Sequence, residues 1–98
     1  MSTQKFATQA LHAGHNVSEN GGTRAVPIYQ STAYVFDSSD HAANLFSLAE
    51  PGNIYSRINS PTNDVLEQRL AALEGGIAAV VTASGTAAIA TSLLTLLK

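Results

Sequence analysis

The last quarter of the sequence constrains the fold most, because an apolar run leads directly into a helix that is apolar nearly all round. Residues 77–83 are almost unbroken apolar sequence, and their length and composition predict a buried strand covered on both faces. After Ser84 and Gly85 the pattern becomes helical, with Ala, Ile and Leu filling most positions of 87–97. A chain of 98 residues offers too little surface to bury such a helix. We therefore expect these residues to be the first part of a larger domain.

A well-marked amphipathic helix precedes the apolar run. Ser60 is a typical N-cap residue, Pro61 suits the first helical position, and Asp64 falls where a negative charge meets the positive helix end. The predicted helix then ends at residues 75–76, which are both glycine. Its apolar face consists of Val65, Leu66, Leu70 and Leu73.

Residues 1–60 are less regular and predict an arm, whereas 61–98 predict the start of a large domain. The arm contains polar, glycine-bearing loop sequence at 15–24, and Pro27 argues against a central strand in the β-prone run around it. The expected elements are a short helix over 5–12 closed by Gly14, β-prone runs at 26–29 and 33–36, and a helix over about 40–48 that Ser38 or Ser39 caps and 51–52 end.

Composition excludes several classes of function. The net charge is −2 with only five Lys and Arg, which argues against nucleic-acid and anionic-membrane partners. Cysteine is absent, so disulfides and thiolate metal sites are excluded, and a cytoplasmic location is expected. The first residues lack the apolar core of a signal peptide, and the apolar stretch near 87–97 is too short to span a bilayer.

The junction Ser84-Gly85-Thr86 has the chemistry of a phosphate cradle. The first turn of a helix carries backbone N–H groups without intrahelical partners and a partial positive charge. Gly85 lets an anion approach the backbone closely, and the hydroxyls of Ser84 and Thr86 can add hydrogen bonds. The alternative is a simple turn with a helix cap, which is the commoner role of such a sequence.

Tyr55 and Arg57 can supply the second half of a phosphate site. The guanidinium fork binds a phosphate through two hydrogen bonds, and the tyrosine hydroxyl adds a third donor. In an extended segment, residues two apart point the same way, so both side chains could reach one ligand. The alternative is a tyrosine that packs on the arm and an arginine in a surface ion pair.

The order of these features resembles the Cys/Met-metabolism family of pyridoxal-phosphate (PLP) enzymes. The resemblance rests on residues 6–14, on 25–36, and on 53–76 leading into 84–88, and it covers essentially the whole chain. Within the family, residues 41–48 before 52–57 are most similar to the O-acetylhomoserine sulfhydrylases. It implies an α/β fold: the N-terminal segment of a fold-type I PLP-dependent transferase, comprising the arm and the first helices and strand of the large α/β/α domain.

The same resemblance assigns roles to the candidate residues. Tyr55 and Arg57 match the family's ligands of the PLP phosphate in a neighbouring subunit. Gly85 and Thr86, next to Ser84, match the position where backbone amides hold the phosphate within the subunit. The family often has Met or Gln where Thr86 stands, but the donor is the main-chain N–H. The resemblance also implies homotetramers built from dimers with shared active sites and an arm that reaches across.

No catalytic residue is expected within these 98 residues. PLP chemistry needs a lysine amine for the Schiff base, and the family's lysine lies well downstream; the sequence contains only Lys5 and Lys98. Lys98 is expected at the end of the last helix remote from the phosphate. The resemblance implies that the parent enzyme replaces the acetoxy group of O-acetylhomoserine with sulfide to give homocysteine, while this chain alone is inactive. The alternatives are a cystathionine γ-synthase or γ-lyase fragment, and a non-catalytic module that docks on a full-length relative.

The remaining polar residues predict structural roles. His12, His15 and His41 are scattered, too few for a metal site, and are expected to be caps or surface residues. The acidic side chains are expected to cap helices or to lie on solvated faces rather than to form a general acid–base pair: Asp37, Asp40, Asp64, Glu67 and Glu74.

Overall fold

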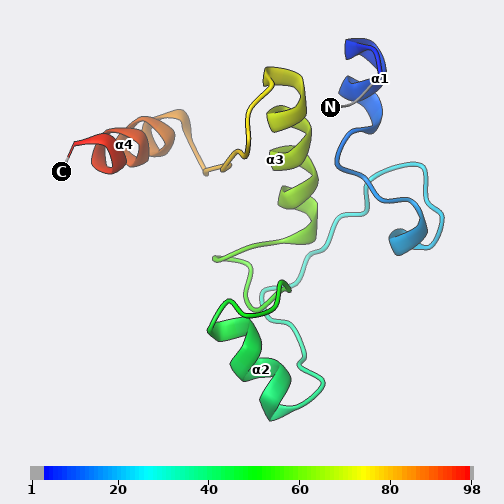
Figure 1. The fold of residues 1–98 in the computed structure, drawn as a ribbon, viewed down its shortest axis with the longest axis vertical. Helices are drawn as coiled ribbons and strands as arrows, with labels where there is room; N and C mark the ends of the chain where they lie inside the picture. The colour runs from blue at the N-terminus through cyan, green and yellow to red at the C-terminus, as the bar shows by residue number, and fades with distance from the viewer. Residues whose placement is uncertain (1–3, 98) are drawn as a thin grey trace.

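The computed structural model describes residues 4–97, and Figure 1 shows their path. This part of the chain is helical, with long irregular connections. Its elements are α1 (Phe6–His12), the short 3₁₀ helix η1 (Ser18–Asn20), α2 (Ser39–Phe46), α3 (Pro61–Glu74) and α4 (Gly85–Leu96).

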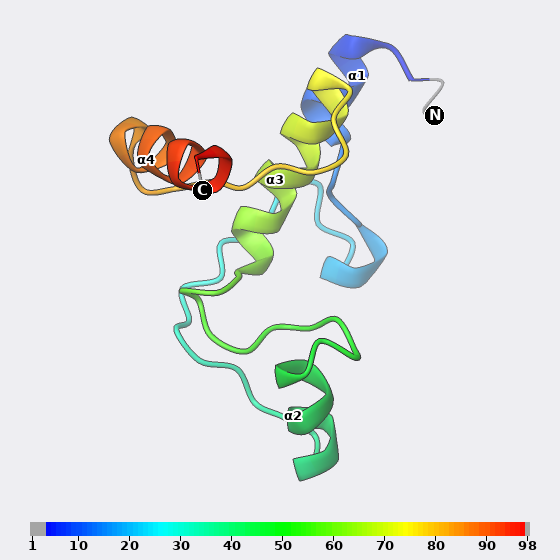
Figure 2. The ribbon, with the colours of Figure 1, turned by 60° about the vertical axis from the view of Figure 1, so that its left-hand side comes forward.

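The helices do not close around a common core. Figures 1 and 2 show α2 and α4 projecting from α3 in different directions. The radius of gyration is 15.5 Å, whereas a compact domain of this length would have about 13 Å. Leu45 is the only hydrophobic side chain buried among residues 4–97, and Ser60 is the only buried polar one. The described segment is therefore an open set of elements rather than a self-contained domain.

The contact between α1 and α3 is the only one between two helices in the described part of the chain. Arg69 donates a hydrogen bond from Nε to the carbonyl oxygen of Ala13, over 2.8 Å. Gly14 follows with a φ of +83°, and a Cβ there would lie 2.8 Å from the carbonyl oxygen of Val65. A glycine is needed at this close, left-handed turn, as the predicted closure of the first helix suggests.

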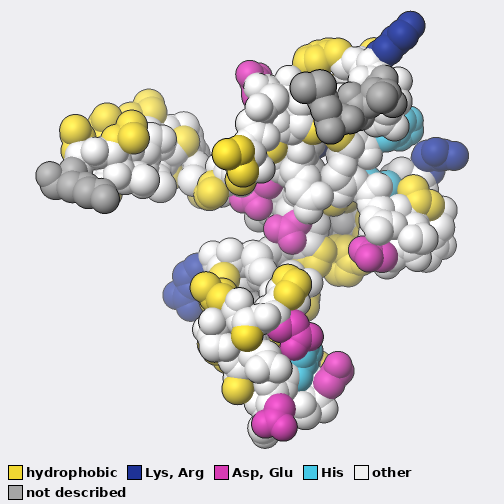
Figure 3. Space-filling model, in the orientation of Figure 1, with side chains coloured by type: hydrophobic (Ala, Val, Ile, Leu, Met, Phe, Trp, Pro, Cys, Tyr) yellow, Lys and Arg dark blue, Asp and Glu magenta, His cyan; other side chains and the backbone are white. Residues whose placement is uncertain are grey.

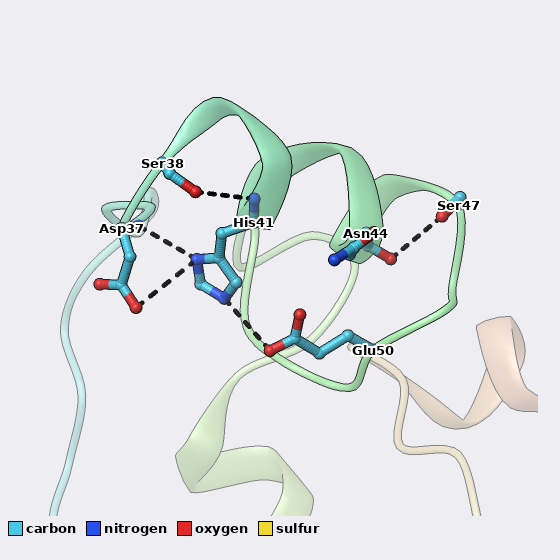
Figure 4. Close-up of polar contacts among 6 residues, drawn as sticks. All are labelled: Asp37, Ser38, His41, Asn44, Ser47 and Glu50. Carbon is cyan, nitrogen blue, oxygen red and sulfur yellow. Dashed lines mark hydrogen bonds and ion pairs between the residues drawn. The ribbon is translucent and has the colours of Figure 1, made fainter.

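α2 is held by its own flanking residues (Figure 4). The Ser38 hydroxyl oxygen accepts the backbone N–H of His41 over 3.0 Å, which confirms Ser38 as the N-cap. The His41 ring accepts the Asp37 N–H at Nδ1 over 3.0 Å, and its Nε2 lies 3.7 Å from a carboxylate oxygen of Glu50. One side chain thus links the residues before α2 to those after it.

The two C-terminal helices begin and end close to where the sequence predicts. Pro61 occupies the first turn of α3, and Gly75 ends that helix in the left-handed conformation with φ 69°. Ser60 stands at the N-cap position of α3 without a side-chain capping bond, whereas the Ser84 hydroxyl oxygen caps α4 by accepting the Ala87 N–H over 3.1 Å.

The predicted strand at 77–83 is not formed: among residues 4–97 this segment is an irregular connection, and Ile77 and Val80 are largely exposed. A strand exists only through hydrogen bonds to neighbouring strands, and residues 4–97 provide none beside it. The β-prone runs of the arm likewise give a single antiparallel bridge, between Ala33 and Tyr55.

The apolar surface of α4 is exposed, as Figure 3 shows by the hydrophobic side chains gathered on this helix. Ile89, Leu93, Leu94 and Leu96 are between 51% and 79% exposed. Among the described residues, no helix combines the length and the apolar character that crossing a membrane requires.

Candidate phosphate-binding site

The turn before α4 presents free donors to an approaching anion. Ser84, Gly85 and Thr86 are all exposed. The N–H groups of Ala87 and Ala88 are taken by the side chain and the carbonyl oxygen of Ser84, but those of Gly85 and Thr86 have no intrahelical acceptor. A Cβ at Gly85 would meet nothing within 4 Å, so the backbone is open at this point. These donors fit a phosphate dianion at the positive end of the helix.

A turn brings Tyr55 and Arg57 together. The Tyr55 carbonyl oxygen accepts the N–H groups of Ile58 and Asn59, so the segment is not extended as we expected. The turn places the Arg57 guanidinium carbon 5.1 Å from the centre of the Tyr55 ring, in cation–π contact. Arg57 is exposed and forms no ion pair with a carboxylate among residues 4–97. Its hydrogen-bonding fork is therefore available to an anionic ligand, and the surface ion pair considered as the alternative role of Arg57 is absent among residues 4–97.

The two halves of the candidate site lie apart within one copy of the chain. The loop that carries Tyr55 and Arg57 leads into the N-terminus of α3, whereas 84–86 follow the connection that leaves its C-terminus; Figures 1 and 2 show α4 directed away from that loop. No hydrogen bond or ring contact joins 55–57 to 84–86 in the described chain. Within one copy, the described chain therefore does not bring the two halves to the same ligand.

Glu67 departs from its predicted role as a solvated charge. One of its carboxylate oxygens accepts the backbone N–H of Val81 over 2.9 Å in a part-buried position. Burial raises the pKa of the neighbouring Asp64 carboxyl above its usual value, and the charge of Glu67 and a hydrogen bond to it raise that pKa further. One sequence signal could have shown that Glu67 is not simply solvated. It stands three residues after Asp64, so the two carboxyl groups share one face of the helix.

The histidines occupy structural positions. His15 bonds through Nε2 with the Thr23 carbonyl oxygen over 2.9 Å, and His41 bridges the ends of α2. Among residues 4–97, no group of three or more His, Asp or Glu side chains is arranged to hold a metal ion. Lys5 is exposed just before α1, and the prediction for Lys98 lies outside the described residues.

The sequence profile of the Cys/Met metabolism PLP-dependent enzymes matches residues 7–98. The chain belongs to this family. Its residues fit the family's cofactor in two respects: unpaired N–H donors lie at an open glycine turn, and an arginine lies free of carboxylates.

Curated relatives are similar over nearly all of the chain. The O-acetyl-L-homoserine sulfhydrylase 1 of Thermus thermophilus is 61% identical over 94% of this chain, and the O-acetyl-L-homoserine sulfhydrylase of Leptospira meyeri is 55% identical over 96%. The chain spans only 22% and 21% of these two relatives, respectively.

Solved structures confirm the fold class. The O-acetylhomoserine (thiol)-lyase of Campylobacter jejuni matches 94% of this chain with a TM-score of 0.89 and 48% identity, and the metB protein of Corynebacterium glutamicum matches 98% with a TM-score of 0.83 and 33% identity. This chain covers 23% of each. The Campylobacter chain carries a pyridoxyl-lysine phosphate at its position 205. The described residues thus have the fold of the N-terminal segment of an α/β fold-type I PLP-dependent transferase.

Proposed function

We propose that this chain is the N-terminal part of an O-acetylhomoserine sulfhydrylase-like enzyme, which replaces the acetate of O-acetylhomoserine with sulfide to give homocysteine in methionine and cysteine biosynthesis. The observation that carries the proposal is that one chain holds two separate groups suited to a phosphate. One is the open turn at Ser84-Gly85-Thr86, and the other is Arg57, which lies beside Tyr55 and forms no ion pair with a carboxylate among residues 4–97. The identity of 61% to the Thermus sulfhydrylase supports this reaction over the γ-synthase and γ-lyase alternatives.

In this proposal the chain helps to bind the cofactor, and the lysine that forms the Schiff base belongs to another part of the enzyme. When bound, PLP supplies an electron sink for carbanions next to the amino group. The N–H groups of Gly85 and Thr86 hold the phosphate, and the Ser84 hydroxyl, which caps α4, keeps the first turn in place. Neither Lys5 nor Lys98 is assigned the Schiff base.

Tyr55 and Arg57 act on the phosphate of a neighbouring subunit in this proposal. Their separation from 84–86 within one copy supports a shared site. Residues 1–60 then form an arm that contacts the neighbour, and 61–98 begin the PLP-binding domain of a homo-oligomer, a tetramer in the full proposal. The exposed apolar side chains of the arm, among them Ile28, Val35 and Leu48, support a covered location for it. Cytoplasmic location is part of the same proposal and is compatible with the cysteine-free sequence.

A complementation experiment in the complete enzyme tests the shared site. Arg57→Ala and Gly85→Val subunits should each bind PLP poorly as homo-oligomers. After joint refolding, a mixed pair contains one site with both wild-type halves, so about a quarter of wild-type PLP binding and homocysteine formation should return. Arg24→Ala, another exposed arginine of the arm, is the control and should behave as wild type.

Two outcomes would contradict the proposal. If mixing restores nothing while the variants assemble normally, the two halves do not share a site between subunits. If the wild-type enzyme releases no homocysteine from O-acetylhomoserine and sulfide but acts on cystathionine, the γ-synthase or γ-lyase alternative replaces the sulfhydrylase.

A further inference from the structure

The connection between α3 and α4 depends on few contacts. Residues 77–83 form no strand in the described chain, and a cavity of about 500 Å³ lies between the start of this connection and α3, lined in part by Ala71, Ala72 and Ile77. The Val81 N–H, which donates to Glu67 over 2.9 Å, makes the only hydrogen bond between 77–83 and α3 among residues 4–97. Glu67 therefore fixes where Val81 stands relative to α3 within the described residues.

The chemistry of the bond makes it a strong one. A carboxylate that accepts a backbone N–H forms a charge-assisted hydrogen bond, about twice as strong as a neutral one. Glu67 is half-buried, which lessens the competition from water.

A second hydrogen bond carries the constraint on to α4. The Thr82 hydroxyl donates to the carbonyl oxygen of Ser84 over 3.0 Å and closes the turn between Val81 and the helix. Ser84 then caps α4 through its own side chain. The bonds thus run without interruption from α3 through residues 81–84 to the first turn of α4, where the free N–H groups lie.

We propose that Glu67 is a positioning residue for the phosphate-binding turn: by holding Val81 it sets where the N–H groups of Gly85 and Thr86 stand. The inference rests on the proposed function, because it assigns the phosphate of PLP to this turn. In this proposal Glu67 does not bind the phosphate itself, because its carboxylate accepts the hydrogen bond from the Val81 N–H.

The test uses the complete enzyme without cofactor and three variants. Glu67→Ala removes the acceptor, and Glu67→Gln retains a neutral one. Glu74→Ala is the matched control, since Glu74 is an exposed carboxylate on the same helix. Each protein is titrated with PLP and, separately, with pyridoxal, which has the same ring without the phosphate. Amide hydrogen exchange at Val81 gives a readout that needs neither ligand nor activity.

Glu67→Ala should weaken PLP binding about tenfold or more, the effect expected for losing a hydrogen bond to a charged group. Binding of pyridoxal should hardly change, and exchange of the Val81 amide should become faster. Glu67→Gln should fall between, and Glu74→Ala should match wild type. An equal loss for PLP and pyridoxal would mean general destabilisation and would overturn the proposal, as would unchanged PLP binding. Wild-type protein that binds no PLP would instead refute the proposed function, and Val81 exchange would still test the link between Glu67 and the connection.

Discussion

Gly85 has two roles that a single substitution can separate. It is the first residue of α4, where an added Cβ would meet no protein atom within 4 Å. Alanine also has a better helix propensity than glycine, by up to about 1 kcal/mol. The protein fold therefore does not require glycine here, whereas close approach of a phosphate to the backbone does.

Gly85→Ala should weaken PLP binding to the complete enzyme about 5- to 150-fold, the range that corresponds to an overpacking cost of about 1–3 kcal/mol. The melting temperature without PLP should stay the same or rise slightly. Titration of the cofactor-free protein and thermal melting measure the two effects. Gly76→Ala is the control, because a Cβ there would make only ordinary contacts of 3.8 Å or more. A melting temperature that falls together with the PLP affinity would mean that the fold, rather than the ligand, requires Gly85.

At the scale of the elements, Gly14 decides how α1 meets α3. Its φ of +83° lies in the left-handed region, and a Cβ would stand 2.8 Å from the carbonyl oxygen of Val65. Gly21 provides a contrast, since its φ of +66° is also positive but a Cβ there would meet nothing within 4 Å. The pair separates backbone strain, which both positions share, from a backbone clash, which only Gly14 has.

Gly14→Ala should displace α1 from α3 and destabilise this contact by more than the roughly 1 kcal/mol that strain alone costs. Gly21→Ala should show the strain cost only. Hydrogen exchange over 6–12, measured in the complete enzyme, reports whether α1 remains in place. Equal exchange in the two variants would show that the clash relaxes away and that α1 does not depend on Gly14.

The sequence predicts the helices well because their signals are local. Ser38 and Ser84 act as caps, Pro61 begins α3, and Gly75 ends it. The strand predicted at 77–83 would need neighbouring strands to bond to, and residues 4–97 supply none, so apolar composition alone could not produce it. The extended geometry expected at Tyr55 is wrong because the segment forms a local turn, in which the Tyr55 carbonyl oxygen accepts the N–H groups of Ile58 and Asn59.

The candidate site follows the same division. Ser84, Gly85 and Thr86 could be selected from the sequence, since a helix start after an apolar run has a definite chemistry. Only the folded chain shows that Arg57 forms no ion pair with a carboxylate among residues 4–97. The same is true of the hydrogen bond between Glu67 and Val81, which are fourteen residues apart. The sequence predicted Glu67 to be a solvated charge because periodicity identifies the polar face of a helix. It does not show which later segment, here the one containing Val81, lies against that face.

At the scale of the whole molecule, residues 4–97 bury little and expose much. Leu45 is the only buried hydrophobic side chain among them, and the apolar residues of α4 lie open to solvent. A cooperative unfolding transition needs a core whose burial offsets the lost conformational entropy. The segment by itself has no such core, and its apolar surface favours association.

The isolated 98-residue chain should therefore elute as aggregates in gel filtration and melt without a cooperative transition. Treatment with PLP and borohydride should give no adduct specific to one lysine, because neither Lys5 nor Lys98 is assigned the Schiff base in this proposal. Mass spectrometry of the reduced, digested chain measures the adducts, and a pre-reduced sample controls for non-specific labelling. A soluble monomer with a sharp melting transition would favour the non-catalytic module that docks on a full-length relative. A single labelled lysine together with turnover would show that the chain itself is the catalyst, and the division of roles proposed for Arg57, Gly85 and the downstream lysine would be wrong.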